Sequence, residues 1–216
     1  GSYCGWLLQE MGADVTRIGP QDNRTDGAIK LAVDFLNRGK GVRQWADFSA
    51  HLDDFDVLMT DDVKLLEKIS MKPLDALASA MPGKVIGVAS IFGLTGPMSD
   101  VQSSGIDAQA LSSIAWVLGD ADREPLTIPP EILASQSGAH LAAAMLAAVM
   151  VPRQAEKARI VDVALADVLA SYVAVNCRFY IHHGMSWARS GRRASDSGGA
   201  YPFVILPCKD GQVCLS

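Results

Sequence analysis

The stretch Val85-Ile86-Gly87-Val88-Ala89-Ser90 leads directly into Ile91-Phe92-Gly93-Leu94-Thr95-Gly96-Pro97. The short apolar run predicts a buried strand, and the segment after it predicts a tight turn rich in glycine. In an open α/β sheet, ligands bind at the carboxyl ends of the strands. Two glycines there let the backbone approach a ligand that a Cβ atom would keep away. We therefore expect a binding edge at residues 91–97, which we call the glycine loop.

The composition favours a well-packed protein and narrows the class of its ligand. Hydrophobic residues make up 49% of the 216 residues and charged residues 20%, so we expect a sizeable core. The net charge of -5 argues against a nucleic-acid partner bound through a basic surface. A local basic patch can still hold an anionic small molecule.

Three further features favour a cytoplasmic protein without a membrane anchor. The longest apolar stretch, Leu141–Val151, has 11 residues and is too short to span a bilayer. The chain does not open with a basic segment followed by an apolar one, as a signal peptide would. The cysteines Cys4, Cys177, Cys208 and Cys214 form no C-x-x-C pair, which is typical of free thiols in a reducing compartment.

Strands alternate with helices over the first hundred or so residues, which is typical of a parallel sheet with helical crossovers. We expect strands at 13–18, 55–59 and 84–90, and helices at 3–11, 45–52 and 63–80, the last broken by Pro73. Residues 29–36 fit either a helix or an extended segment. Because the chain opens in a helix and passes at once to a strand, we expect an earlier strand to be missing and the chain to be part of a longer one.

The pattern changes after Asp100. We expect helices at 106–118, 135–150 and 165–182, and a strand at 158–164. The helix at 135–150 is strongly apolar, and its pattern predicts complete burial. A polar linker at 186–199 and a hairpin formed by 203–206 and 212–215 follow. We therefore expect a large α/β domain over 1–185, the linker, and the start of a small domain at 200–216.

Three segments carry candidate chemistry, and each has a plain structural alternative. Asn37-Arg38-Gly39-Lys40, with Arg43 after it, offers a phosphate grip or forms a solvated turn. Asp107 and Glu131 stand near predicted helix starts. Either can act as an acid/base group, although the helix dipole favours carboxylates at such positions in any case.

The sequence predicts no metal centre. His140 on the apolar helix fits a core residue, and His182-His183 has no partners at the spacing of a zinc site. Six acids lack the order of a calcium loop and fit a solvated edge: Asp47, Asp53, Asp54, Asp56, Asp61 and Asp62. The chain has no nucleophile elbow, Walker loop or G-x-G-x-x-G fingerprint.

Several segments, in the same order, resemble the class III CoA-transferases, a group that includes formyl-CoA transferase, carnitine-CoA transferase and the α-methylacyl-CoA racemases. The matching segments are Gly1–Gly5, Leu7-Leu8, Met11–Val15, Leu36–Lys40 (an N-R-G-K turn), Phe92–Pro97 (an F-G-x-T-G-P loop), Ala108–Ser112 with Gly119-Asp120, Ser137–Leu141, Val161–Ala164 and Pro207–Gly211.

The resemblance implies a Rossmann-like, mostly parallel sheet with flanking helices, and an interlocked homodimer. It implies transfer of CoA between an acyl-CoA and a small carboxylic acid, with no permanently bound cofactor. The residues that it places at the CoA site are Arg38, Lys40, Ser90, Phe92, Gly93 and Thr95.

The resemblance also locates the position of the nucleophile. In that family, an aspartate at the start of the buried helix takes the acyl group as an anhydride, and CoA then converts it to an enzyme thioester. Counting back from Ser137-Gly138-Ala139-His140 places this position at Ala134, which has no nucleophile. A second family carboxylate, or the racemase His-Asp pair, falls on Ser104-Gly105, and a CoA-contacting N-F pair falls on Asp61-Asp62.

Two hypotheses follow from this departure. The protein is either a divergent enzyme in which Glu131 or Asp107 replaces the aspartate, or a non-catalytic member that acts as a partner subunit or an acyl-CoA binder. A nucleotide-binding α/β domain of another kind is a more distant alternative, because its phosphate loop would follow the strand that we expect to be missing.

Overall fold

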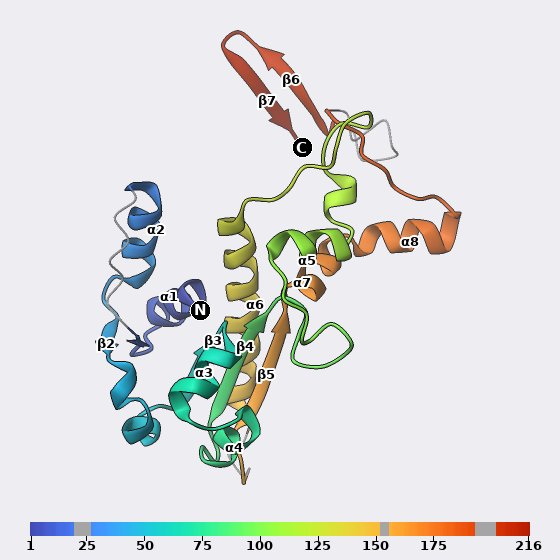
Figure 1. The fold of residues 1–216 in the computed structure, drawn as a ribbon. Helices are drawn as coiled ribbons and strands as arrows, with labels where there is room; N and C mark the ends of the chain where they lie inside the picture. Colours follow the sequence, from blue (N-terminus) through green and yellow to red (C-terminus); the bar gives the residue numbers. More distant parts are fainter. Residues whose placement is uncertain (20–26, 152–155, 193–201) are drawn as a thin grey trace. The chain divides into compact units, whose positions relative to one another are not determined.

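The computed structural model describes residues 1–19, 27–151, 156–192 and 202–216 (Figure 1). These residues form two compact units. Unit 1 comprises Gly1–Asp100 and Glu131–Leu165, and unit 2 comprises Val101–Pro130 and Ala166–Ser216. The predicted division into 1–185, 186–199 and 200–216 stays a prediction, and residues 193–199 of the predicted linker lie outside the described residues.

Unit 1 consists of parallel strands with helices between them, which confirms the predicted α/β fold. Its strands are β1 (Thr16–Ile18), β2 (Gly41–Arg43), β3 (Val57–Thr60), β4 (Val85–Ser90) and β5 (Arg159–Ala164). Its helices are α1 (Ser2–Glu10), α2 (Gly27–Asn37), α3 (Val63–Ser70), α4 (Leu74–Ser79) and nearly all of α6 (Pro130–Met150). β1 pairs with β2, and β3, β4 and β5 form a second sheet in that order, with every pair parallel.

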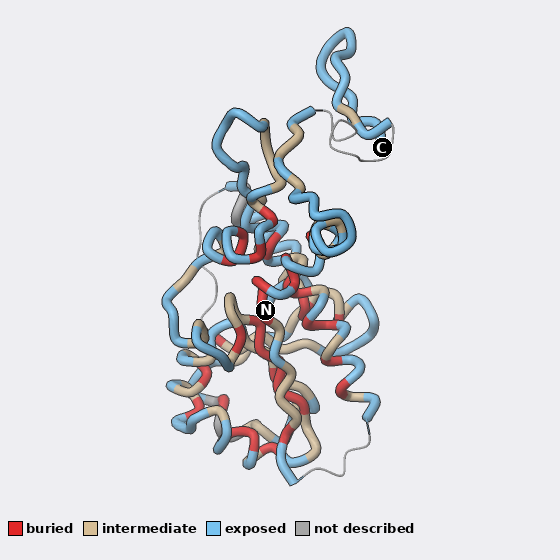
Figure 2. The backbone as a smooth tube through the Cα atoms, turned by 90° about the vertical axis from the view of Figure 1, so that its right-hand side faces the viewer, coloured by how far each residue is buried: buried red, intermediate tan, exposed pale blue. Residues whose placement is uncertain are grey.

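The middle strand β4 is covered on both faces. All residues of Val85–Ala89 are buried (Figure 2). Ile86 and Val88 pack in a cluster with residues of α3 and α4, whereas Val85 and Ala89 pack in another with residues of α1 and α6. A continuous apolar run is what a parallel strand between two helical layers requires, and the prediction of a buried strand is confirmed.

The long helix α6 is buried on one face only, so the prediction of complete burial is wrong. Its buried residues are spaced mostly three or four apart: Leu133, Ser137, Gly138, Leu141, Ala142, Met145 and Ala148. Leu146 and Met150, on other faces of the helix, are exposed. By length and composition alone α6 could cross a membrane. Because Leu141 and Met145 are fully buried in the cluster that contains β4, we interpret α6 as the core helix of unit 1.

Three short segments of unit 1 have a secondary structure that the sequence did not predict or left open. Residues 29–36 belong to the helix α2. Residues 45–52 form the 3-10 helices η1 (Trp45–Asp47) and η2 (Ser49–Asp54) rather than one α-helix, and His51 has non-helical backbone angles. The strand β2 has no counterpart in the prediction, because three residues are too few to show the two-residue period of a strand.

Unit 2 contains α5 (Gly105–Leu111), η3 (Ala115–Val117), most of α7 (Leu165–Tyr172), α8 (Ala174–His183), β6 (Val204–Cys208) and β7 (Gly211–Leu215). The predicted helix 106–118 is interrupted after α5, where Ser113 has a φ of 65°. The predicted helix 165–182 is divided at Val173, which has φ -100° and ψ 9°. The antiparallel pairing of β6 with β7 confirms the predicted hairpin.

The first part of the predicted linker is held against the loop that follows η3. The Arg189 guanidinium donates hydrogen bonds to the carbonyl oxygens of Trp116 (3.1 Å) and Asp120 (3.2 Å), and lies 4.8 Å from the centroid of the Trp116 ring. The Trp116 indole in turn donates to the carbonyl oxygen of Trp187 at 3.1 Å. Residues 187–189 are therefore a packed part of unit 2.

The close approach of α6 to α1 at Gly138 gives a test of this packing. A Cβ atom at Gly138 would lie 3.0 Å from the backbone nitrogen of Cys4 and 3.0 Å from Cβ of Tyr3. We expect Gly138→Ala to lower the free energy of unfolding by about 1–2 kcal/mol, because overpacking against backbone outweighs the gain in helix propensity. Urea unfolding measures the difference. Ala143→Gly, at an exposed position of α6, calibrates helix propensity. A G138A variant as stable as the wild type contradicts this packing.

Candidate functional site

The glycine loop begins where β4 ends, and its conformation depends on its glycines. The Gly93 N–H donates a hydrogen bond to Oγ of Ser90 at 2.9 Å, which closes the first turn. Gly93 has a φ of 88° and Gly96 a φ of 94°, both in the region that favours glycine. Gly93 is buried, whereas a Cβ atom at Gly96 would meet no other atom within 4 Å. The loop therefore has a packed base and an open tip.

Of the four predicted ligand residues at the glycine loop, two form its packed base and two lie nearer its open tip. Ser90 and Gly93 form the base of the loop, where the Ser90 hydroxyl accepts the hydrogen bond described above. Phe92 is half-buried and Thr95 is exposed. A ligand at this edge would therefore meet Thr95 and the Gly96 backbone before it meets Ser90 or Gly93.

A carboxylate from the neighbouring strand also holds the loop. Oδ2 of Asp162, on β5, accepts a hydrogen bond from the Leu94 N–H at 2.8 Å. The sequence alone does not predict this contact, because the two residues lie 68 positions apart. The signal that could have found it is a single acid within the apolar run Ile160–Ala164 of this strand.

Lys40, of the predicted phosphate grip, is partly buried against α1. Its Nζ donates to the carbonyl oxygen of Ser2 at 2.8 Å and to Oδ1 of Asn37 at 3.2 Å. Burial lowers the pKa of Lys40, with the nearby Arg17 acting in the same direction and Cys4 acting against it. Burial raises the pKa of the Cys4 thiol to about 11, so Cys4 is neutral near pH 7 and does not neutralise the ammonium.

The two cations Lys40 and Arg17 therefore lie near one another without a carboxylate partner among the residues that the structure describes. Arg17 lies on β1, opposite Val42 of β2. The sequence alone does not indicate a role for Arg17, because only the pairing of β1 with β2 brings it near Lys40. Two like charges close together favour the binding of an anionic ligand.

Arg38, the other member of the predicted grip, is engaged within the protein. Its Nη2 donates to Oε1 of Glu10 at 3.1 Å, and its guanidinium lies 4.5 Å from the centroid of the Phe35 ring. Its carbonyl oxygen accepts a hydrogen bond from the Gln9 amide at 3.1 Å. The side chain is still 57% exposed, so an anion can reach it from solvent.

Asp107, the first of the two candidate catalytic acids, caps a helix. Its Oδ2 accepts hydrogen bonds from the backbone N–H of Ser104 at 2.7 Å and from the Ser104 hydroxyl at 2.9 Å. These hydrogen bonds, the backbone one first, hold the pKa of Asp107 below its ordinary value of 3.8. The contacts form a capping box at the start of α5 in unit 2.

Glu131, the second candidate, belongs to unit 1 and lies in the first turn of α6, where it is exposed. Ala134 is exposed one turn further along the same helix. Residues three apart on a helix are neighbours, with Cβ atoms about 5–6 Å apart. A carboxylate at Glu131 can therefore reach the space beside Ala134.

The acids around β3 have structural partners. Asp62 caps α3 through the Leu65 N–H, which donates to its Oδ1 at 2.9 Å. Oδ2 of Asp54 accepts from Arg43 at 2.8 Å and lies 3.0 Å from Nδ1 of His51. Within the described ranges, no group of three or more His, Cys, Asp or Glu side chains could hold a metal ion.

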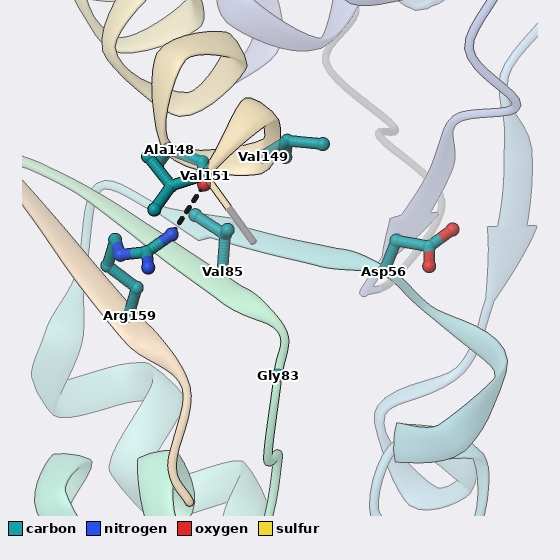
Figure 3. A pocket seen from close by; sticks show the side chains of 7 residues that line it. All are labelled: Asp56, Gly83, Val85, Ala148, Val149, Val151 and Arg159. Carbon is teal, nitrogen blue, oxygen red and sulfur yellow. Dashed lines mark hydrogen bonds between the residues drawn. The ribbon is translucent and has the colours of Figure 1, made fainter. Parts of the chain in front are cut away.

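A small pocket lies at the opposite end of the sheet from the glycine loop. It is lined by Asp56, Gly83, Val85, Ala148, Val149, Val151 and Arg159 (Figure 3). Nη1 of Arg159 donates to the carbonyl oxygen of Ala148 at 2.6 Å, so this guanidinium satisfies a carbonyl in the last turn of α6. Because the pocket is at the amino ends of β4 and β5, we do not assign the ligand to it.

The capping box gives a prediction with a defined pH dependence. The pKa of Asp107 is lowered in the folded state, so its stabilising effect is present above its ordinary pKa of 3.8 and is lost as the pH falls through the folded value. We expect Asp107→Asn to lower the midpoint of thermal unfolding at pH 7, and this difference to shrink below pH 4. Asp122→Asn, in an exposed loop, is the matched control. A difference that is constant with pH contradicts the ionic cap.

Comparison with known proteins identifies the family to which this arrangement belongs. The sequence profile of CoA-transferase family III matches residues 55–216. The chain is 25% identical to the succinate–glutarate CoA-transferase of Agrobacterium fabrum, an alignment that covers 100% of this chain and 59% of that protein.

Solved structures share the fold. A CAIB/BAIF family protein from Brucella suis matches with a TM-score of 0.83 and 22% identity, over 98% of this chain and 60% of that one. Rv3272 from Mycobacterium tuberculosis, in its orthorhombic form, matches with a TM-score of 0.73 and 20% identity, over 100% of this chain and 59% of that one. The chain thus spans about 60% of the length of these relatives. Since the profile matches most of its residues, the chain belongs to CoA-transferase family III.

Proposed function

We propose that this chain is part of an enzyme that transfers CoA between an acyl-CoA and a small carboxylic acid. Family membership supports the reaction class. The observation that carries the proposal within the structure is the glycine loop, whose base is fixed at the carboxyl end of β4 and whose tip at Gly96 is open. CoA and acyl-CoA are then substrates, and no permanently bound cofactor is needed. We further propose a homodimer in the cytoplasm.

The reaction requires a carboxylate near the thioester. In the first step the carboxylate oxygen attacks the thioester carbonyl, an anhydride forms, and the CoA thiolate leaves. In the second step the thiolate attacks the carboxyl carbon of the enzyme, which gives an enzyme thioester and releases the donor acid as its carboxylate. The acceptor carboxylate then reverses this sequence and leaves as the new acyl-CoA.

Glu131 is the better of the two candidate nucleophiles. The two hydrogen bonds from Ser104 to Oδ2 of Asp107 stabilise its carboxylate and lower its pKa, which weakens it as a nucleophile. Glu131 is exposed and lies one helical turn before Ala134, the position to which the family resemblance assigns the aspartate. Its extra methylene helps it to reach the space beside Ala134.

Trapping of the acyl-enzyme tests this assignment in the full-length protein. Succinyl-CoA with glutarate is the first substrate pair, because these acids are named for the Agrobacterium fabrum relative. We expect hydroxylamine to convert Glu131 to a hydroxamate that mass spectrometry locates, and Glu131→Gln to lower kcat/KM at least about a hundredfold. Glu124→Gln, in the exposed loop before α6, is the control.

A second variant separates loss of the nucleophile from loss of the site. Ala134→Asp in the Glu131→Gln background places a carboxylate where the resemblance expects one, and we expect it to restore transfer and move the adduct to position 134. An adduct on Asp107 instead would contradict the role of Glu131.

The second candidate function is a non-catalytic acyl-CoA binder or partner subunit. The alanine at position 134 favours it, because an exposed methyl group supplies neither nucleophile nor acid. This alternative predicts no adduct and no exchange in the wild type, with acyl-CoA binding still detectable by calorimetry. Gain of transfer activity by Ala134→Asp alone would then show that the rest of the site is intact.

The two cations Lys40 and Arg17 give a prediction about the phosphates of CoA. We expect Arg17→Met and Lys40→Met each to weaken CoA binding about tenfold, because each removes a charge-assisted contact, and to leave binding of acyl-pantetheine, which lacks the nucleotide and its phosphates, unchanged. Isothermal calorimetry measures both ligands. Lys64→Met, at an exposed position of α3, is the control. Equal losses for both ligands would contradict a phosphate role.

A further inference from the structure

We propose that Asp162 is the positioning residue of the glycine loop, and that its carboxylate fixes the conformation in which the loop meets its ligand. The identity of that ligand as an acyl-CoA rests on the proposed function. The positioning role itself rests on contacts within unit 1.

The strand register explains how a residue of β5 can reach this loop. Asp162 is paired with Val88 of β4, and Ala164 is paired with Ser90, the last residue of β4. Leu94 lies beyond Ser90 in the chain, yet its N–H contacts the side chain of Asp162, which is paired two residues before that end. The loop therefore folds back over the end of the sheet instead of extending away from it.

Three restraints meet at two adjacent residues of the loop. The Gly93 N–H is bound by Oγ of Ser90 at 2.9 Å, and the Leu94 N–H is bound by Oδ2 of Asp162 at 2.8 Å. A Cβ atom at Gly93 would lie 3.3 Å from the same Oδ2 and 3.6 Å from Cβ of Ala164. The carboxylate thus holds the loop and at the same time fills the space that any side chain at position 93 would need.

The restraint acts next to the open tip. The side chain of Leu94 packs against the apolar cluster of β4, α3 and α4, so residue 94 is anchored through both its backbone and its side chain. Thr95 and Gly96 follow at once and are exposed. The part of the loop that is free to contact a ligand therefore starts from an anchored residue.

The carboxylate of Asp162 belongs to neither apolar cluster of unit 1. Its neighbours in β5, Val161 and Val163, pack on the cluster that contains α1 and α6, and Ile160 packs on the opposite cluster, whereas the side chain of Asp162 is exposed. A hydrogen bond from a backbone N–H to a charged carboxylate is stronger than one to a neutral acceptor. The contact therefore stabilises the loop rather than the core.

Hydrogen exchange of the loop tests the proposal without relying on activity. In the full-length protein we expect Asp162→Ala to speed exchange of the peptide that contains residues 91–97 about tenfold, while the peptide that contains β4 keeps its protection. Asp162→Asn keeps an oxygen acceptor and is expected to restore most of the protection. Asp100→Ala, at the exposed far end of the same segment, is the matched control and leaves exchange unchanged.

Calorimetry with an acyl-CoA, and kinetics where the protein is active, extend the test to the ligand. We expect Asp162→Ala to weaken acyl-CoA binding and raise KM about tenfold with a smaller change in kcat, and Asp162→Asn to recover most of the loss. Gly93→Ala disturbs the same contact from the loop side. We expect the double variant Gly93→Ala/Asp162→Ala to lose less binding free energy than the two single variants lose together, because both changes remove the same interaction.

The outcomes distinguish this proposal from the proposed function. If hydrogen exchange of residues 91–97 is unchanged in Asp162→Ala, the positioning role is overturned, whatever the protein binds. If that variant does not fold, unchanged exchange in Gly93→Ala has the same consequence. Faster exchange with no acyl-CoA binding by the wild type supports the positioning role and overturns the proposed function. Faster exchange with unchanged acyl-CoA binding overturns the claim that the held conformation is the one that meets the ligand.

Discussion

The structure of unit 1 depends on the burial of β4 between two helical layers. The strand can be covered on both faces only if the helices approach closely, and small residues permit this. A Cβ atom at Gly87 would lie 3.1 Å from Cδ1 of Leu141 and closer still to the side chain of Met145, both on α6. Gly138 has the same function on the helix side, where α6 meets α1. This packing fixes β4, and the register of β5 against β4 then determines which side chains surround the glycine loop.

The sequence predicts the features that depend on local pattern. The apolar run of β4, the helix break at Pro73 and the hairpin at the C-terminal end all have signals within a few residues, and all are found. The errors arise where the local pattern carries no information. Helix α6 is strongly apolar, yet only one face is buried, because burial also depends on what surrounds the helix. The positive φ of Ser113 likewise divides a helix whose composition is continuous.

The candidate site shows the same division between local and distant information. The glycine loop is recognisable from its own residues, and the capping box of Ser104 and Asp107 has the three-residue spacing of a helix start. Arg17 and Asp162 are not recognisable in this way. The first acquires a role through the pairing of β1 with β2, and the second through its position opposite Val88. A single sequence contains the residues of such contacts but not the register that brings them together.

The geometry of the loop and the identity of the nucleophile are physically independent. The loop is held by Ser90, Asp162 and the burial of Leu94, all within unit 1, and none of these contacts involves position 134. An alanine there removes a nucleophile without disturbing the restraints that shape the loop. The fold can therefore keep a ligand-binding edge while the chemistry moves to another carboxylate of α6 or is lost. For this reason the open loop supports binding of a thioester more strongly than it supports catalysis, and the presence or absence of an acyl adduct on a carboxylate decides between the two proposed functions.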